Sequence, residues 1–136
     1  MKYFKRANIY KNSTGTNTFY VEKQCATSYG WWEYVKRING QLVFNDYSYS
    51  NSTAKHQSAM RSLLRDLGYH SYLNIEAPGG LQDLDSAIKY YESKIENLRA
   101  AMAKPRTRKA KNAERQSDIN FYESKMSEVF ALQKGA

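Results

Sequence analysis

Cysteine and histidine are scarce in this sequence, and each scarcity excludes a class of site. Cys25 is the single cysteine, which excludes an internal disulfide and a zinc site built on several thiolates. The two histidines, His56 and His70, have no partners at metal-ligand spacing. We therefore expect neither a metal centre nor any other cofactor.

Long apolar runs are also missing. No segment approaches the roughly 20 consecutive apolar residues that a membrane-spanning helix needs. The first six residues, MKYFKR, lack the apolar core of a secretory signal. These two absences predict a cytoplasmic protein that has no contact with membranes.

The motifs of common enzyme classes are absent as well. Pro78-Gly79-Gly80 has neither the spacing nor the lysine of a phosphate-binding loop. A thiol–imidazole pair would have to use Cys25, and a lone cysteine beside Ala26 is more typical of a structural residue. We expect a protein that is not an enzyme.

Acidic side chains are outnumbered by basic ones. The 136 residues include 21 Lys or Arg and 13 Asp or Glu, which gives a formal net charge of +8. Residues 1–80 hold ten basic and five acidic side chains, and residues 81–136 hold eleven and eight. A charge of this size favours a polyanionic partner, either a nucleic acid or an acidic protein surface.

Helical periodicity is abundant over residues 81–132. Apolar side chains recur there at alternating spacings of three and four, which is typical of a coiled-coil helix. The pattern breaks at Pro105 and then resumes. Its members are Leu81, Leu84, Ile88, Tyr91, Ile95, Leu98, Met102, Ile119, Tyr122, Met126 and Val129. Folding the chain back between positions 106 and 107 brings Tyr91 opposite Tyr122, so the pattern predicts an antiparallel helical hairpin.

The two predicted helices also contain an internal repeat. The segment YYESKI, which begins at Tyr90, matches FYESKM, which begins at Phe121, at an offset of 31 residues. Tyr90 and Phe121 occupy equivalent outward positions, and two helices alone bury too little surface to be stable. We expect these two aromatic side chains to dock on the rest of the chain or on a second copy in a homodimer.

The chain before the hairpin is typical of a sheet packed by a helix. Asn39-Gly40 favours a type I′ turn between two β-favouring runs, and further extended runs precede it. Residues 50–68 favour a helix between N-cap side chains and a terminal glycine. The predicted class is α+β: a three- to four-stranded antiparallel sheet packed by one helix, followed by a coiled-coil-like helical hairpin. The predicted domains are 1–77 and 81–136, with a linker at 78–80.

Side-chain alternation divides the predicted strand pair around Asn39-Gly40 into two faces. The first face, with Trp31, Val35, Leu42 and Phe44, is the expected core. The second face mixes aromatic side chains with a lysine, a combination that suits base stacking and phosphate attraction. Its candidate binding residues are Trp32, Tyr34, Lys36 and Tyr47. The alternative is a second sheet face that is partly covered by the protein itself.

Positive charge is concentrated around Pro105, at the predicted tip of the hairpin. The cations there are Lys104, Arg106, Arg108, Lys109, Lys111 and Arg115. Cations at the start of a helix oppose its dipole, which costs a few tenths to about 1 kcal/mol each when exposed. The cluster predicts a prong that contacts phosphates or an acidic partner. The alternative is a solvated loop that keeps a small protein soluble.

Two resemblances accompany these patterns. The order of strands and helix over residues 16–68 resembles the architecture of the AP2-type DNA-binding domain. The run NDYSYSNSTAKHQ, residues 45–57, is similar to small uncharacterised proteins of tailed bacteriophages. The second resemblance implies an accessory or host-takeover protein in the cytoplasm of a bacterial host.

The sequence predicts a small, basic, non-enzymatic accessory protein that binds DNA or RNA and is encoded by a bacteriophage. The alternative is a host-takeover or anti-defence inhibitor. Such an inhibitor would bind a host protein complex at an acidic or nucleic-acid-binding surface.

Overall fold

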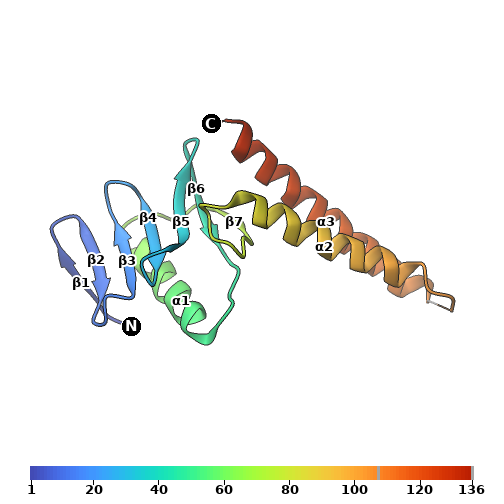
Figure 1. Cartoon of the computed structure of the whole chain (residues 1–136), viewed down its shortest axis with the longest axis horizontal. Coiled ribbons are helices and arrows are strands. Elements are labelled where there is room, and N and C mark those ends of the chain that lie inside the picture. Colours follow the sequence, from blue (N-terminus) through green and yellow to red (C-terminus); the bar gives the residue numbers. More distant parts are fainter. Residues whose placement is uncertain (107, 136) are drawn as a thin grey trace.

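The computed structural model describes residues 1–106 and 108–135. It is elongated, with a β-sheet at one end and two long helices at the other (Figure 1). Within these residues, seven strands form one sheet in sequence order, and neighbours are antiparallel except β6 and β7, which are parallel. The elements are β1 (Tyr3–Arg6), β2 (Ile9–Asn12), β3 (Asn17–Tyr20), β4 (Cys25–Ser28), β5 (Trp32–Ile38), β6 (Gln41–Asn45), α1 (Asn51–Asp66), β7 (Leu73–Ile75), α2 (Leu84–Met102) and α3 (Lys109–Lys134).

The α+β class is right, but the predicted architecture is wrong. The sheet has seven strands instead of three to four, and the described chain has three helices. Strands β1 to β4 have four residues each, which is too short for a clear alternation in the sequence. Strand β7 follows α1 and pairs in parallel with β6, a long-range contact that local patterns do not show.

Helix α1 covers one face of the sheet, and the core beneath it is a row of cross-strand neighbours. Phe19, Ala26, Val35 and Phe44 lie side by side on β3 to β6, and all four are fully buried. Met60 of α1 packs in the same core. Burial of these apolar side chains holds the helix against the strands.

A β-bulge interrupts the alternation on β5. Ala26 pairs with Val35, and the next residue, Thr27, pairs with Glu33, so Tyr34 is an extra residue on the longer strand. A bulge of this kind places two consecutive side chains on the same face. Tyr34 and Val35 accordingly both point into the core under α1.

The bulge reverses the predicted positions of the two tryptophans. Trp32 and Tyr34 are both 0% exposed in the core, whereas Trp31 is 59% exposed. The prediction that Trp31 lies in the core and that Trp32 and Tyr34 lie on a binding face is therefore wrong. One extra residue on β5 changes the face of every side chain that precedes it.

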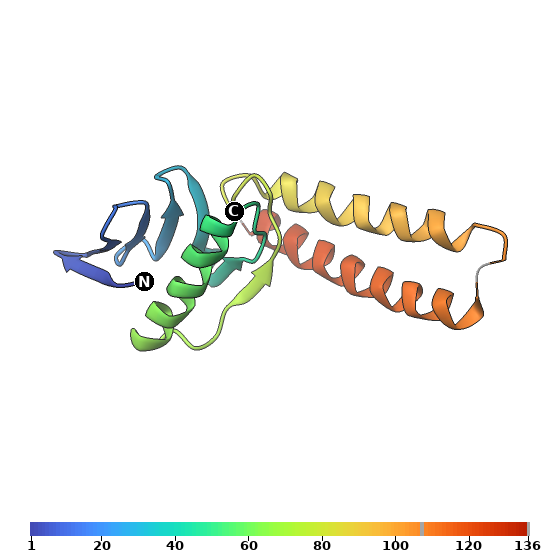
Figure 2. The ribbon, with the colours of Figure 1, turned by 90° about the horizontal axis from the view of Figure 1, so that it is seen from below.

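Helices α2 and α3 run antiparallel and extend away from the sheet (Figure 2). Tyr91 and Tyr122, which the predicted register places opposite each other, have ring centroids 5.9 Å apart. Near the base of the pair, Val129 shares a core with Val43 and Ile75 of the sheet. The face of β6 and β7 opposite α1 is therefore covered by the helical hairpin.

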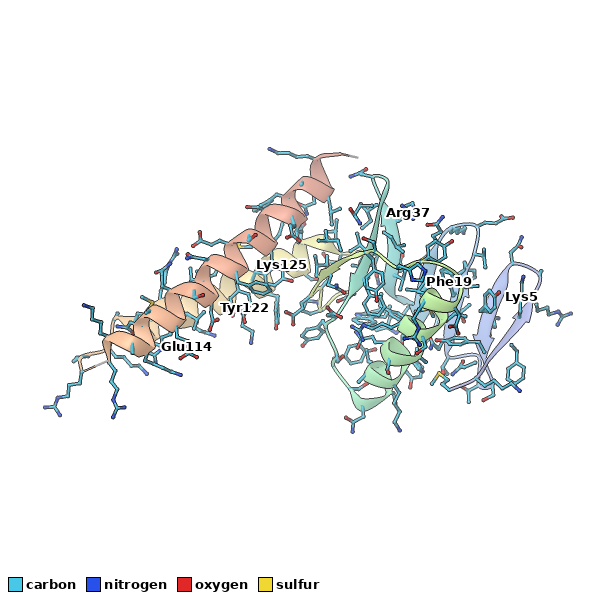
Figure 3. The ribbon with its side chains drawn as sticks, turned by 180° about the vertical axis from the view of Figure 1, so that it is seen from behind. Lys5, Phe19, Arg37, Glu114, Tyr122 and Lys125 are labelled. Atoms are coloured by element: carbon cyan, nitrogen blue, oxygen red, sulfur yellow. The ribbon has the colours of Figure 1, made fainter. Side chains whose placement is uncertain are left out.

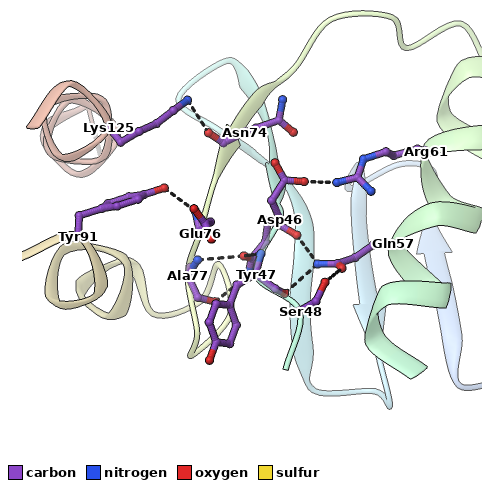
Figure 4. Close-up of polar contacts among 11 residues, drawn as sticks. Asp46, Tyr47, Ser48, Gln57, Arg61, Asn74, Glu76, Ala77, Tyr91 and Lys125 are labelled. Atoms are coloured by element: carbon purple, nitrogen blue, oxygen red, sulfur yellow. Dashed lines mark hydrogen bonds and ion pairs between the residues drawn. The ribbon is translucent and has the colours of Figure 1, made fainter. Parts of the chain in front are cut away.

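Polar contacts also join the hairpin to the sheet (Figure 4). The Tyr91 hydroxyl accepts a hydrogen bond of 2.7 Å from the backbone N–H of Glu76. Lys125 Nζ donates to the backbone carbonyl of Asn74 at 2.8 Å. Because one bond ends on the backbone of β7 and the other on the residue that follows it, they hold the two helices in a defined direction relative to the sheet.

A buried polar cluster lies beneath α1. His56 is almost fully buried, with Nδ1 2.8 Å from Ser28 Oγ and Nε2 3.3 Å from Thr16 Oγ1. Desolvation by burial lowers the pKa of His56 below its ordinary value. The fold therefore favours the neutral imidazole.

Acidification is expected to weaken the fold through His56. Its pKa is lowered in the folded state, so its contribution to stability is complete above the unfolded-state pKa of about 6.5 and is lost as the pH falls through the folded-state pKa. One proton can change the free energy of unfolding by at most about 1.4 kcal/mol per pH unit. Urea unfolding gives the free energy of unfolding at about pH 7 and at about pH 5. Between these two pH values, the free energy of unfolding should fall less for His56→Gln than for the wild type. Equal losses would contradict this assignment.

Candidate nucleic-acid interface

The turn between α2 and α3 forms the end of the molecule that lies farthest from the sheet (Figure 2). Ala103 is the C-cap residue of α2, and α3 begins at Lys109. Between them Arg106 has a φ of 66°, in the left-handed region. We call the described residues 104–106 and 108–115 the cationic tip.

The cationic tip contains six basic side chains and one carboxylate, Glu114, which gives a formal charge of +5. Lys104, Arg106, Arg108, Lys109 and Lys111 are exposed, and Arg115 is half-buried. Figure 3 shows the side chains at this end of the hairpin pointing into solvent beyond Glu114. All six sequence-predicted tip residues that could contact an anion are thus brought together at one end.

An ion pair within the cationic tip is exposed. It joins Lys111 Nζ to Glu114 Oε2 at 3.5 Å. Exposed pairs of this kind contribute about 0–1 kcal/mol, so an anionic ligand can displace them. Arg115 Nη1 donates to Asn112 Oδ1 at 3.1 Å, a neutral acceptor that leaves its charge in place.

The first turn of α3 adds backbone donors to these cations. Arg108 occupies the N-cap position without a side-chain cap, and the first turn contains no acidic residue. The N–H groups at the start of a helix have no partners within the helix, and the helix dipole is positive there. Both features favour a bound anion at the same place as the basic side chains.

The rest of the hairpin has the opposite charge balance. Residues 81–103 and 116–135 contain five Lys or Arg and seven Asp or Glu, a formal charge of −2. Some of these charges pair across the helices, as Arg99 Nη2 does with Glu123 Oε1 at 3.2 Å. The net positive charge of the hairpin therefore lies at its end.

The predicted stacking surface on the sheet is not assembled. Trp32 and Tyr34 are in the core, where Trp32 Nε1 donates to the Pro78 carbonyl at 3.0 Å. Lys36 forms a 3.1 Å ion pair with Glu33, and Tyr47 packs against the hairpin. Two of the four predicted residues thus have no surface on which a base could stack.

Tyr90 and Phe121 have different environments despite their equivalent positions in the repeat. Tyr90 donates a hydrogen bond to Glu76 Oε2 at 2.9 Å, and its ring lies 5.6 Å from that of Tyr47. It therefore helps to dock the hairpin on its own sheet. Phe121 is 54% exposed and packs on its neighbour Tyr122.

The His56 imidazole has partners other than the Cys25 thiol. The His56 ring is hydrogen-bonded to Ser28 and Thr16. Burial, with a smaller effect of the Glu33 carboxylate, raises the pKa of the Cys25 thiol to about 11. The thiol is therefore protonated at neutral pH and is a weak nucleophile.

Sequence reasoning missed a second group of surface side chains, at the other end of the molecule. Phe4 is 53% exposed on β1, beside the exposed cations Arg6 and Lys11. Residues 1–25 contain five Lys or Arg and one Glu, a signal that could have drawn attention to this end. The face on which these side chains lie depends on the strand register, which the sequence alone does not reveal.

The part of the chain that the structure describes holds neither a metal-ligand cluster nor a membrane-spanning helix. In residues 1–106 and 108–135, no group of three or more His, Cys, Asp or Glu side chains could hold a metal ion. No helix in the same residues is both long and apolar enough to cross a membrane. No protein-family model, curated protein or solved structure shows a significant match to this chain.

Proposed function

We propose that this protein binds nucleic acid through its cationic tip. The observation that carries this proposal is the separation of charge along the hairpin. A formal charge of +5 lies at a protruding end, on helices whose remaining residues carry −2. A solubilising surface has no need of this arrangement, because charges spread over the whole stalk would serve equally well.

The mode of binding is contact with the phosphate backbone. Arg106 and Arg108 can each form two parallel hydrogen bonds to one phosphate, and the lysines add point charges. The free N–H groups at the start of α3 can bind a further phosphate oxygen. Phosphate contacts carry no direct sequence information, so binding of DNA or RNA at the tip is independent of base sequence.

A mobility-shift assay with DNA and RNA at two salt concentrations tests this function. With about five phosphate contacts, affinity should fall on the order of 10²–10³-fold between about 50 mM and about 200 mM salt, because bound cations are released. Affinity that is unchanged between the two concentrations would overturn the proposal.

An acidic protein surface is the alternative partner for the same cations. It predicts that neither nucleic acid is shifted at low salt, while immobilised polyglutamate retains the chain. That combination of results would mean that the partner is an acidic protein and that the cationic tip is still the binding site.

A further inference from the structure

The sheet has a face without a helix over its first three strands. Helix α1 lies on one side of the sheet, and the hairpin covers the other side at β6, β7 and the end of β5, where Val43, Ile75 and Ile38 meet it (Figures 1 and 2). On this second side, Phe4, Arg6 and Lys11 of β1 and β2 are exposed, Ile9 and Tyr20 are half-buried, and Thr18 of β3 is buried. We call five of these side chains the open sheet face: Phe4, Arg6, Ile9, Lys11 and Tyr20.

Strand register places these five side chains together. Arg6 pairs with Ile9, and Ile9 pairs with Tyr20, so these three form a row across β1, β2 and β3. Phe4 pairs with Lys11 in the next row on the same side. The open sheet face therefore alternates aromatic or apolar surface with positive charge.

The open sheet face is hollowed rather than flat. A depression of about 450 Å³ is lined by Phe4, Arg6, Ile9 and Lys11. A second depression of about 250 Å³ adjoins it along Ile9 and reaches Tyr20. The two depressions share Ala7 and Ile9 in their linings, so a flat ring can lie against Phe4 in the first and against Tyr20, beside Glu22, in the second.

This end of the chain is the second concentration of positive charge. Residues 1–25 carry a formal charge of +4, and their one carboxylate, Glu22, accepts a 2.9 Å hydrogen bond from Asn8. With +5 at the cationic tip, the rest of the chain carries −1. Figure 3 shows β1, marked by Lys5, at the end of the molecule opposite the tip. The net charge of +8 is thus divided between two opposite ends.

We propose that the open sheet face binds a single-stranded segment of nucleic acid. Unpaired bases stack on Phe4 and Tyr20, and Arg6 and Lys11 contact the phosphates. A duplex does not fit this chemistry, because its base faces are already stacked. A second copy of this chain is disfavoured as the occupant, since pairing of like faces would bring the same cations together.

A bridging activity follows from the positions of the two sites. Because they lie at opposite ends, one protein can hold a single strand on the open sheet face while the cationic tip contacts a second segment. The bridging rests on the proposed function of the tip. Single-strand binding by the open sheet face does not, so the two can fail separately.

The first experiment tests the open sheet face in a variant with a weakened tip: Arg106→Ala, Arg108→Ala and Lys109→Ala lower the formal charge of the tip from +5 to +2. Fluorescence anisotropy with a labelled oligothymidylate should show binding that is tighter than to a duplex of equal length. Adding Phe4→Leu, which keeps an apolar side chain but removes the ring, should weaken it about fivefold or more.

Arg6 and Lys5 provide a matched pair of controls on one strand. They carry the same charge, but Lys5 points to the other side of β1, where its Nζ lies 5.6 Å from the ring centroid of Tyr10. Arg6→Ala should weaken single-strand binding severalfold more than Lys5→Ala. Equal losses for the two, no effect of Phe4→Leu, or equal affinity for polyglutamate would overturn the proposed site.

The second experiment measures bridging, by capture of a labelled oligothymidylate on an immobilised duplex. The wild-type chain should capture it, and the double variant Phe4→Leu, Arg6→Ala should bind the duplex but capture nothing. If the immobilised duplex does not retain the wild type while the oligothymidylate still binds in solution, the proposed function of the tip is contradicted and the proposed function of the open sheet face is supported. If the duplex retains the wild type and the double variant captures as much oligothymidylate as the wild type does, the proposed role of the open sheet face is contradicted.

Discussion

Reversing three charges at the cationic tip should abolish duplex binding at physiological salt. The variant Arg106→Glu, Arg108→Glu, Lys109→Glu changes the tip from a formal charge of +5 to −1. Three phosphate contacts are lost and three repulsive carboxylates replace them, so the affinity for a duplex should fall at least a hundredfold. A mobility shift with wild type and variant at equal salt measures the loss.

A matched variant separates the position of the charges from their number. Lys89, Lys94 and Lys134 are exposed on the hairpin away from the tip, and changing all three to Glu lowers the net charge by the same six units. This control should lose several times less affinity than the tip variant. Equal losses would mean that the overall charge, and not the tip, attracts the nucleic acid.

The second large effect concerns Asn45, which joins the sheet to the chain leading into the hairpin. It is fully buried, and its Nδ2 donates to the carbonyl of Ala77 at 2.8 Å. Its Oδ1 accepts from the N–H groups of Ala77 at 2.9 Å and Tyr47 at 3.1 Å. Asn45→Ala would leave the two buried backbone groups of Ala77 and the part-buried N–H of Tyr47 without these partners, at a general cost of about 1–3 kcal/mol for each buried group.

Urea unfolding should therefore show a loss of about 3 kcal/mol or more for Asn45→Ala. Asn120→Ala is the control, because Asn120 is exposed in the middle of α3, where alanine is the better helix former. The control should change the free energy of unfolding by less than about 1 kcal/mol. A loss of that small size for Asn45→Ala would contradict the role assigned to its side chain.

Local signals in the sequence were sufficient for several features of the fold. The Asn39-Gly40 turn sets the pairing of Ile38 with Gln41, as the sequence predicts. The apolar spacing likewise predicts the contact between Tyr91 and Tyr122. Both features depend on residues close to a turn, where one local choice determines the register.

Features that depend on distant contacts were not predictable in the same way. The bulge at Tyr34 arises where β5 meets β4, and it moves Trp32 into the core. Val43 faces the hairpin, so both faces of β6 are buried, and simple alternation cannot distinguish a core face from a binding face there.

The same distinction applies to the candidate sites. The cationic tip was predictable because its six cations lie within 12 consecutive residues around a helix break. The open sheet face was not, because Phe4, Lys11 and Tyr20 come from three strands and meet only through their register. A site whose residues meet only in the tertiary structure can be found only from the coordinates, whereas a site formed around a single turn can be predicted from the sequence.

The salt dependence of duplex binding tests the role of the cationic tip most directly. Each phosphate contact contributes about 0.9 to the slope of log K against log salt concentration. The slope of the wild type should therefore be steeper by about 2.7 than that of the variant Arg106→Ala, Arg108→Ala, Lys109→Ala. Two equal slopes would show that these side chains do not contact phosphates, and the proposed function would be wrong.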